Sequence, residues 1–224
     1  IDNTANWDAS CLLTGGNCSN TGQTNTKRNP NTRVFWTTDA SGNGISLGWG
    51  QLDATMRALL DAGDSQGQKR LSHLMGDTAY DGAVVPPSTS IFRKRKGILG
   101  DIIHAGTAVV GPPNKVSAYG LNTTWSDRLY AGTAPEAAAS AQTYTAFANA
   151  YNTRQNVAYV GANDGFLHGF RAGTYDATGK NFVKNDASKP NDGYEVLAYM
   201  PRSVLSRIHS TDNAKDLSNS QYGH

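Results

Sequence analysis

The sequence lacks the long apolar runs of a membrane protein. None of its 224 residues falls in a run that approaches the roughly 18 apolar residues of a membrane-spanning helix, and Ile1–Thr4 do not begin a signal peptide. We expect any targeting segment to have been removed or to lie outside this sequence. Charge is also scarce, since 17% of the residues are charged and the net charge is +2. So mild a charge does not predict nucleic acid or an anionic membrane as a partner.

Cysteine is rare as well. Cys11 and Cys18 are separated by six residues that include a Gly-Gly pair. This spacing is compatible with a local disulfide, which in so short a loop would contribute roughly 2 to 3 kcal/mol to stability, and two free thiols are the alternative. A zinc site would need two further soft ligands nearby, and the neighbouring sequence offers none. A disulfide would favour an oxidising compartment.

Catalytic motifs are missing too. The sequence has no Gly-x-Ser-x-Gly turn and no phosphate-binding glycine pattern. Asp39, Ser41 and Asn43 have the spacing that begins a calcium loop, but no acidic residue stands where the last ligand would be, so a polar turn is the preferred interpretation. We therefore expect a protein that is not an enzyme, with no catalytic residue, cofactor-binding residue or metal ligand in this sequence.

Glycine and small neutral polar residues are abundant instead. The chain has 24 glycines and many Asn, Ser and Thr residues, while 38% of its residues are hydrophobic. Such a composition is typical of short strands joined by many turns. It predicts a mainly β fold with a few helices.

The clearest strand signal is a hairpin at 157–171. Apolar residues alternate before its turn, and Phe166, His168 and Phe170 alternate after it. An Asp-Gly pair at the bend supplies the positive φ that a tight hairpin needs, so Asp164 is interpreted as a turn residue rather than a catalytic acid. We expect His168 to pack between aromatic rings and to hydrogen-bond a neighbouring blade. The structural residues of this hairpin are Gly161, Asn163, Asp164, Gly165 and His168.

Two more strand-like runs, at 101–111 and 195–201, accompany this hairpin. Together they supply four antiparallel strands, as in one propeller blade. The predicted fold is therefore part of a β-propeller, with one near-complete four-stranded blade and pieces of its neighbours. A blade with open edges is marginal alone, so the remaining strands are expected from missing sequence or from another chain. A further hairpin is predicted at 32–49.

Two inserted helices are predicted, at about 50–62 and about 135–152. The first has an apolar stripe with helical spacing, and the second is Ala-rich and opens with a proline. Its Tyr144, Phe147 and Tyr151 are expected to pack on the blade.

The chain divides by composition into two parts. Residues 1–30 are polar with little periodicity, which predicts an extended Cys-containing arm, and 31–224 form the partial propeller. The run Arg93–Lys96 is interpreted as a solvated strand or loop edge rather than a nucleic-acid site, because no aromatic residue is interleaved with its cations. His73 is expected to be a packed or surface histidine rather than a ligand. Any ligand-binding residues are expected on loops such as 112–156 and 172–194, or outside this chain.

The segments Leu99–His104, Tyr159–Phe170 and Ala198–Pro201 resemble the C-terminal β-propeller of the PilY/PilC family, the tip-associated adhesin and biogenesis proteins of bacterial type IV pili. The likeness covers about 31–224. It implies a non-enzymatic adhesin or assembly factor that binds minor pilins, pilus tip proteins, or a host or abiotic surface. It also implies export through the periplasm to an extracellular site, at the cell surface or pilus tip.

Three departures limit what the resemblance carries over. Ala105–Thr107 stands where the family usually has a Ser- and Pro-containing run. Met75–Asp77 stands where many members have Arg-Gly-Asp, so integrin-type recognition is not implied. The family's Asp-rich calcium loop is absent, so no cofactor is expected in this segment and calcium is implied only for the missing part of the propeller. Gln221–His224 resembles the opening of a next blade, which suggests a longer protein.

Two other hypotheses stay open. The hairpin and the turn Asp176–Gly179 also resemble repeats of quinoprotein dehydrogenase propellers, although no quinone ligands are recognisable. A sugar-binding surface module would need an exposed, flat aromatic platform made by Trp36, Trp49 or Trp125.

Overall fold

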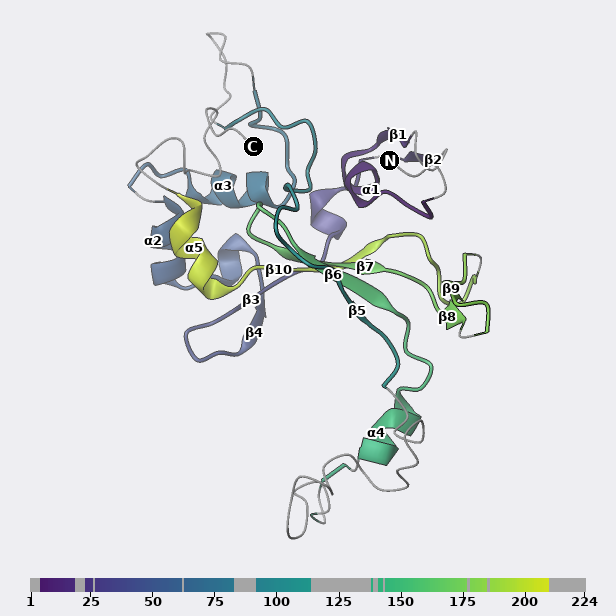
Figure 1. Cartoon of the computed structure of the whole chain (residues 1–224). Helices are drawn as coiled ribbons and strands as arrows, with labels where there is room; N and C mark the ends of the chain where they lie inside the picture. The colour runs from purple at the N-terminus through teal and green to yellow at the C-terminus, as the bar shows by residue number, and fades with distance from the viewer. Residues whose placement is uncertain are drawn as a thin grey trace.

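The fold is built around one six-stranded sheet with the strand order β4-β3-β10-β7-β6-β5 (Figure 1). A computed structural model describes residues 5–18, 23–25, 27–61, 63–82, 92–113, 138, 141–142, 144–176, 178–184 and 186–209. The strands of this sheet are β3 (Phe35–Thr38), β4 (Gly44–Ser46), β5 (Ala108–Val110), β6 (Val157–Gly161), β7 (Leu167–Arg171) and β10 (Glu195–Tyr199). Two small hairpins are separate from it, β1 (Gly16–Cys18) with β2 (Gln23–Asn25) and β8 (Tyr175–Asp176) with β9 (Asn181–Phe182).

The predicted set of four antiparallel strands is confirmed. β5, β6, β7 and β10 are consecutive antiparallel neighbours, and the hairpin register places Val160 opposite His168. The second predicted hairpin is β3 with β4. It does not start a separate sheet, because β3 pairs in parallel with β10 and so extends the same sheet. The coarse prediction, a mainly β fold with a few helices, therefore agrees with the structure.

Three helices and one face of the sheet enclose the larger core. They are α2 (Ala54–Asp61), α3 (Gly67–Leu74) and α5 (Arg202–Ile208), which lie together beside the β3–β10 part of the sheet (Figure 1). Each contributes buried apolar side chains at helical spacing. Their cluster with the sheet residues consists of Phe35, Leu47, Leu52, Met56, Leu60, Leu71, Leu74, Phe166, Ala198, Met200, Leu205 and Ile208.

A smaller cluster joins the N-terminal residues to the sheet. Leu13 of α1 (Ala9–Thr14) is buried with Ile98, Val160 and Phe170, and the Trp7 ring lies 6.0 Å from the Phe170 ring. The described part of 1–30 is therefore not an extended arm, since it forms a helix and a short hairpin. Helix α1 begins after Asp8, whose carboxylate accepts the Cys11 N–H at 3.0 Å. The segment is polar and has little apolar periodicity, so its helix is stabilised mainly by the burial of Leu13.

Both predicted inserted helices are shorter than expected. Residues 49–51 form a 3-10 turn, η2 (Trp49–Gln51), and α2 begins only after Asp53, whose carboxylate accepts the Met56 N–H at 2.9 Å. A second 3-10 turn, η1 (Pro30–Thr32), precedes β3. The later helix, α4, spans Tyr144–Ala150, whereas 138 and 141–142 are not helical and 135–137 lie outside the described residues. Alanine content alone is a weak helix signal without packing.

Helix α4 lies away from the sheet, beyond the start of β6 (Figure 1). The rings of Phe147 and Tyr151 contact each other with centroids 4.9 Å apart, and Tyr151 remains 46% exposed. The expectation that this aromatic stripe packs on the blade is therefore wrong for Tyr151. The side chain of Tyr144 lies outside the described residues.

None of the helices in the described part of the chain combines the length and apolarity needed to cross a membrane.

Candidate functional site

The turn of the central hairpin has the expected geometry. Gly165 has φ of 88°, and its N–H donates to the carbonyl of Ala162 at 3.2 Å. Gly161 ends β6 opposite Leu167, and the Asn163 N–H donates to the Asp101 carbonyl at 3.0 Å. The turn thus connects β6 to β7 and also holds the segment that leads toward β5.

A chain of buried charges runs from this turn into the sheet. His168 contacts Asp164 through Nε2 at 3.0 Å and Glu195 through Nδ1 at 2.7 Å. Arg33 donates to both oxygens of Glu195, at 2.6 and 2.8 Å, and to the Met75 carbonyl at 2.7 Å. The exposed fractions are 0% for His168, 1% for Glu195, 6% for Asp164 and 7% for Arg33. These four residues form what we call the buried network. It links the turn to β7, to β10 and to the segment before β3.

The surroundings of His168 agree only in part with expectation. Its ring lies 5.8 Å from the ring of Phe170, nearly parallel to it, and 5.8 Å from the ring of Phe166. Packing between aromatic rings is thus confirmed. Its hydrogen-bond partners, however, belong to its own turn and its own sheet rather than to a neighbouring blade. Asp164 also accepts the N–H groups of Phe166 and Gly100, as a turn residue does.

In this network the paired charges shift the pKa values more than burial does. Burial alone would lower the pKa of His168, but Asp164 and Glu195 raise that pKa to about 9. Burial likewise raises the pKa of Glu195, but Arg33 and His168 bring that pKa down to about 2. Burial also acts upward on Asp164, whose pKa is nevertheless lowered, chiefly by His168. At neutral pH two positive and two negative groups compensate one another, which is the condition for keeping charges inside a protein.

A second polar cluster surrounds His73. Its Nδ1 lies 2.7 Å from Asp81, and Arg95 donates to the same carboxylate at 3.0 and 3.1 Å. Burial lowers the pKa of His73, whose ring is 1% exposed. Arg93 is buried as well. His73 was predicted to be either a packed or a surface histidine, and the structure shows the packed one. A solvated edge is the wrong interpretation for Arg93, which is buried, and for Arg95, whose hydrogen bonds to Asp81 and to the His73 carbonyl hold it inside.

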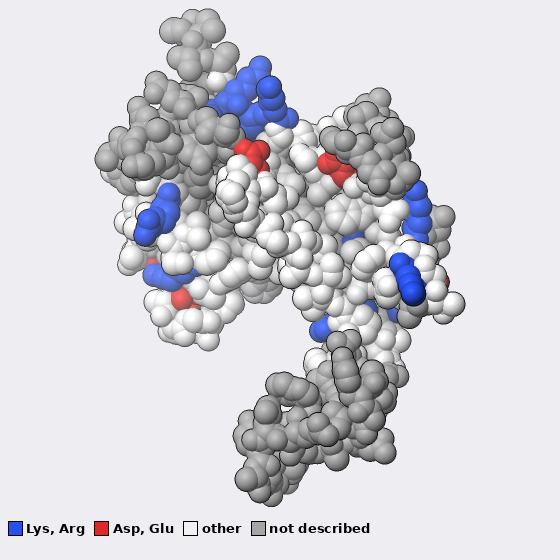
Figure 2. Space-filling model, in the orientation of Figure 1, with Lys and Arg blue, Asp and Glu red and all other residues white. Residues whose placement is uncertain are grey.

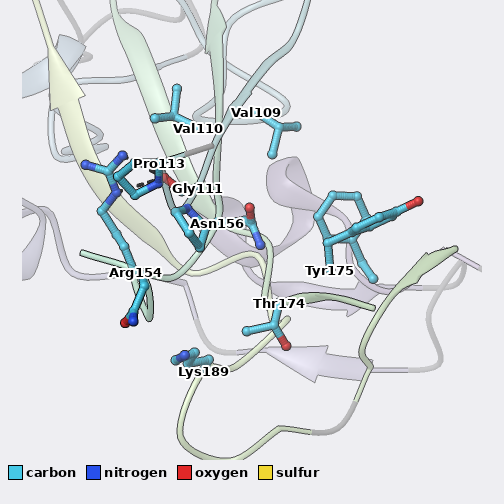
Figure 3. Close-up of a pocket in the computed structure, with 12 residues that line it drawn as sticks. Val109, Val110, Gly111, Pro113, Arg154, Asn156, Thr174, Tyr175 and Lys189 are labelled. Carbon is cyan, nitrogen blue, oxygen red and sulfur yellow. Dashed lines mark hydrogen bonds between the residues drawn. The ribbon is translucent and has the colours of Figure 1, made fainter. Parts of the chain in front are cut away.

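The cavity in Figure 3 is the candidate binding site, and it lies where β5 and the residues just after it meet the lining residues at 152–156, 174–175, 182 and 189. Its volume is about 740 Å³, within the range of ligand pockets. It is lined by Val109, Val110, Gly111, Pro112, Pro113, Asn152, Arg154, Asn156, Thr174, Tyr175, Phe182 and Lys189. We call this feature the β5 cavity.

The β5 cavity combines aromatic and cationic side chains. Tyr175 and Phe182 form an edge-to-face pair with ring centroids 5.3 Å apart, and both are exposed. The Arg154 guanidinium donates twice to the Gly111 carbonyl, at 2.9 and 2.6 Å, which fixes it at the end of β5. Lys189 is the other charged residue among the described lining residues, and neither Asp nor Glu is among them. The arrangement can bind an anionic or hydrogen-bonding ligand.

The remaining predicted site residues do not form a further site in the described part of the chain. The side chain of Cys18 lies outside the described residues, so the Cys11–Cys18 disulfide stays a prediction. Trp49 packs against the larger core, Trp36 is 41% exposed, and Trp125 lies outside the described residues. Among the residues with described positions, no group of three or more His, Cys, Asp or Glu side chains could hold a metal ion.

Charge on the visible surface is dispersed. Figure 2 shows the Lys and Arg side chains of the coloured residues in small separate groups rather than in one continuous area. A nucleic-acid backbone is normally bound by a continuous basic surface.

Sequence reasoning missed two members of the buried network, Arg33 and Glu195, and most of the β5 cavity. Arg33 and Glu195 are separated by 162 positions, and no local pattern connects them. A glutamate at the start of an otherwise apolar strand was the one available signal, because an acidic residue on a buried strand needs a partner.

Comparison with known proteins found relatives with one common description. The chain is 30% identical over 168 residues to the type IV pilus biogenesis factor PilY1 of Pseudomonas aeruginosa strain PAK, which covers 72% of this chain and 11% of that protein. It is 32% identical over 160 residues to a PilY1 homolog of Xylella fastidiosa strain Temecula1, which covers 71% of this chain and 10% of the homolog. The match thus spans about a tenth of the length of these relatives.

No family model matches the sequence, and no solved structure matches the fold.

Proposed function

Because this chain contains a segment of the PilY1 family of type IV pilus biogenesis factors, we propose that it is part of a non-enzymatic adhesin or assembly factor at the pilus tip. In this proposal the longer protein is exported through the periplasm and is held at the cell surface or the tip of the pilus. Its partners are minor pilins or other tip proteins, or a surface to which the cell attaches. The similarity to proteins named for pilus biogenesis is the observation that carries the proposal.

A propeller scaffold is part of the same proposal. The four antiparallel strands β5, β6, β7 and β10 have the size and order of one blade. Large apolar side chains also lie on the sheet face opposite His168, where Trp36 is 41% and Leu167 is 38% exposed. Tyr199 is the register partner of both residues, so the three lie in one row across β3, β10 and β7. A neighbouring blade packed on this row would remove it from water.

The described polar groups favour binding over catalysis. The buried network contains the histidine and carboxylates that could exchange protons, but its exposed fractions are between 0% and 7%, so a substrate does not reach them. The β5 cavity is open to solvent, but none of its described lining residues is Asp, Glu, His, Cys or Ser. We therefore assign the network to support of the sheet and the cavity to binding. Calcium binding, which the resemblance implies for the family, is proposed for a segment outside this chain.

Deletion and complementation test the proposal. Removal of the gene is expected to abolish surface pili, counted by electron microscopy, and the full-length protein is expected to restore them and to co-purify with minor pilins. Pili that persist at the normal number after deletion would contradict the assignment. A quinone absorption band in the purified full-length protein, together with dye-linked alcohol oxidation, would replace it with the dehydrogenase hypothesis.

A further inference from the structure

Strand β5 stands at the edge of the sheet and forms one wall of the β5 cavity (Figure 3). We propose that β5 accepts an extended acidic segment of a partner protein as an added strand, with the side chains of that segment entering the cavity. The inference rests on the proposed function, since it names the kind of partner and the place where it binds.

The backbone of β5 is available for such pairing. β5 pairs with β6 through the register Ala108↔Tyr159, Val109↔Ala158 and Val110↔Val157, and no strand pairs with its other side in the described part of the chain. All three residues of the strand are exposed. Alternate N–H and C=O groups of an edge strand point away from its partner, and an extended peptide satisfies them.

The side chains beside this edge favour a partner with apolar residues. Val109 is 49% exposed and Val110 is 46% exposed, although valine is usually buried in strands. Across the cavity, Tyr175 and Phe182 are 52% and 36% exposed. An added strand would place alternate side chains over these surfaces, and their burial would contribute about 25 cal/mol for each Å² of apolar area removed from water.

The charges of the cavity favour an acidic segment. Arg154 and Lys189 both line it, and no described lining residue is acidic. Because two hydrogen bonds to the Gly111 carbonyl hold Arg154 beside the last residues of β5, its charge is fixed next to the path of an added strand. Acidic side chains that alternate with apolar ones would therefore meet Arg154 and Lys189. No ion pair within the described lining would have to be broken for this contact.

Synthetic peptides test this with the full chain. A fluorescent peptide of alternating valine and glutamate is expected to bind, by anisotropy at low salt, more tightly than the same peptide with lysine in place of glutamate. Lys189→Glu is expected to weaken the affinity for the glutamate peptide by about fivefold, which corresponds to the loss of one exposed ion pair. Lys94→Glu makes the same change in charge at an exposed position outside the cavity and serves as the matched control. Hydrogen exchange is expected to slow at residues 108–110 in the complex.

Equal binding of the two peptides, equal effects of the two variants, or unchanged exchange at residues 108–110 would each overturn the inference. So would displacement of the peptide by polygalacturonate with no slowing of exchange, which would assign the cavity to acidic sugars. Concentration-dependent self-association that protects β5 would instead assign the edge to a second copy of the chain. Normal piliation and minor-pilin binding by a full-length Lys189→Glu protein with no peptide affinity would refute this inference while leaving the proposed function intact.

Discussion

Replacement of Glu195 by glutamine tests the buried network. Its carboxylate accepts two hydrogen bonds from Arg33, at 2.6 and 2.8 Å, and lies 2.7 Å from His168. Glutamine keeps the shape of the side chain but removes the charge, so two buried cations would face Asp164 as the single carboxylate of the network. Breaking a buried ion pair in this way costs about 3 to 5 kcal/mol, and we expect Glu195→Gln to lower the free energy of unfolding by that amount.

The same network predicts the pH dependence of stability. Folding raises the pKa of His168 from 6.5 to about 9, so its contribution is complete below pH 6.5 and is lost as pH rises through about 9. At about 1.4 kcal/mol for each pKa unit, the loss is about 3 kcal/mol. Folding lowers the pKa of Glu195 from 4.5 to about 2, so that contribution is present above pH 4.5 and is lost as pH falls toward 2. The combined contribution of His168 and Glu195 to stability is therefore expected to be greatest between pH 4.5 and 6.5.

Urea denaturation followed by tryptophan fluorescence measures both effects. Asp192→Asn is the control, because the Arg171–Asp192 pair is partly exposed and such pairs contribute about 1 kcal/mol or less. In Glu195→Gln the decline between pH 6.5 and 9 is expected to shrink, since one of the two carboxylates that hold the His168 proton is neutral. The reasoning is refuted if Glu195→Gln costs no more than Asp192→Asn, or if wild-type stability is flat from pH 6.5 to 9. Should the variant not fold, an NMR titration that gives wild-type His168 a pKa below 6.5 would refute it instead.

Three further predictions concern single positions. Leu13→Ala is expected to lower the free energy of unfolding by about 2 to 5 kcal/mol, measured with urea, because Leu13 is 1% exposed; a loss below that of an exposed Leu59→Ala would contradict its place in the core. Gly165→Ala is expected to lower the free energy of unfolding by about 1 to 2 kcal/mol, because φ is 88° and the new Cβ would lie 3.1 Å from Val204. The loss is expected as a lower Tm, and an unchanged Tm would contradict this turn geometry. Reduction of a Cys11–Cys18 disulfide is expected to cost roughly 2 to 3 kcal/mol, and a mass spectrum with two alkylated thiols before reduction would exclude the bond.

Local sequence patterns determined the elements of the central sheet. The alternation around Phe166 and Phe170 and the Asp-Gly turn are properties of neighbouring residues, so they predicted β6, β7 and the positive φ of Gly165. The helical spacing of Met56 and Leu60 predicted α2 in the same way, although the start of the helix depended on Asp53 as its cap. Composition also predicted the fold class, because many glycines and few charges suit short strands and turns.

Only the tertiary structure decided what surrounds these elements. The polar N-terminal segment has little periodicity, and its helix forms where Leu13 finds a buried site against Phe170. Arg33 and Glu195 are paired because β3 lies beside β10, a contact between segments that are far apart in the sequence. The β5 cavity likewise forms where separate loops meet an edge strand. The period of each strand is set by neighbouring residues. The partner of a buried charge and the lining of a cavity depend instead on which distant segments pack together.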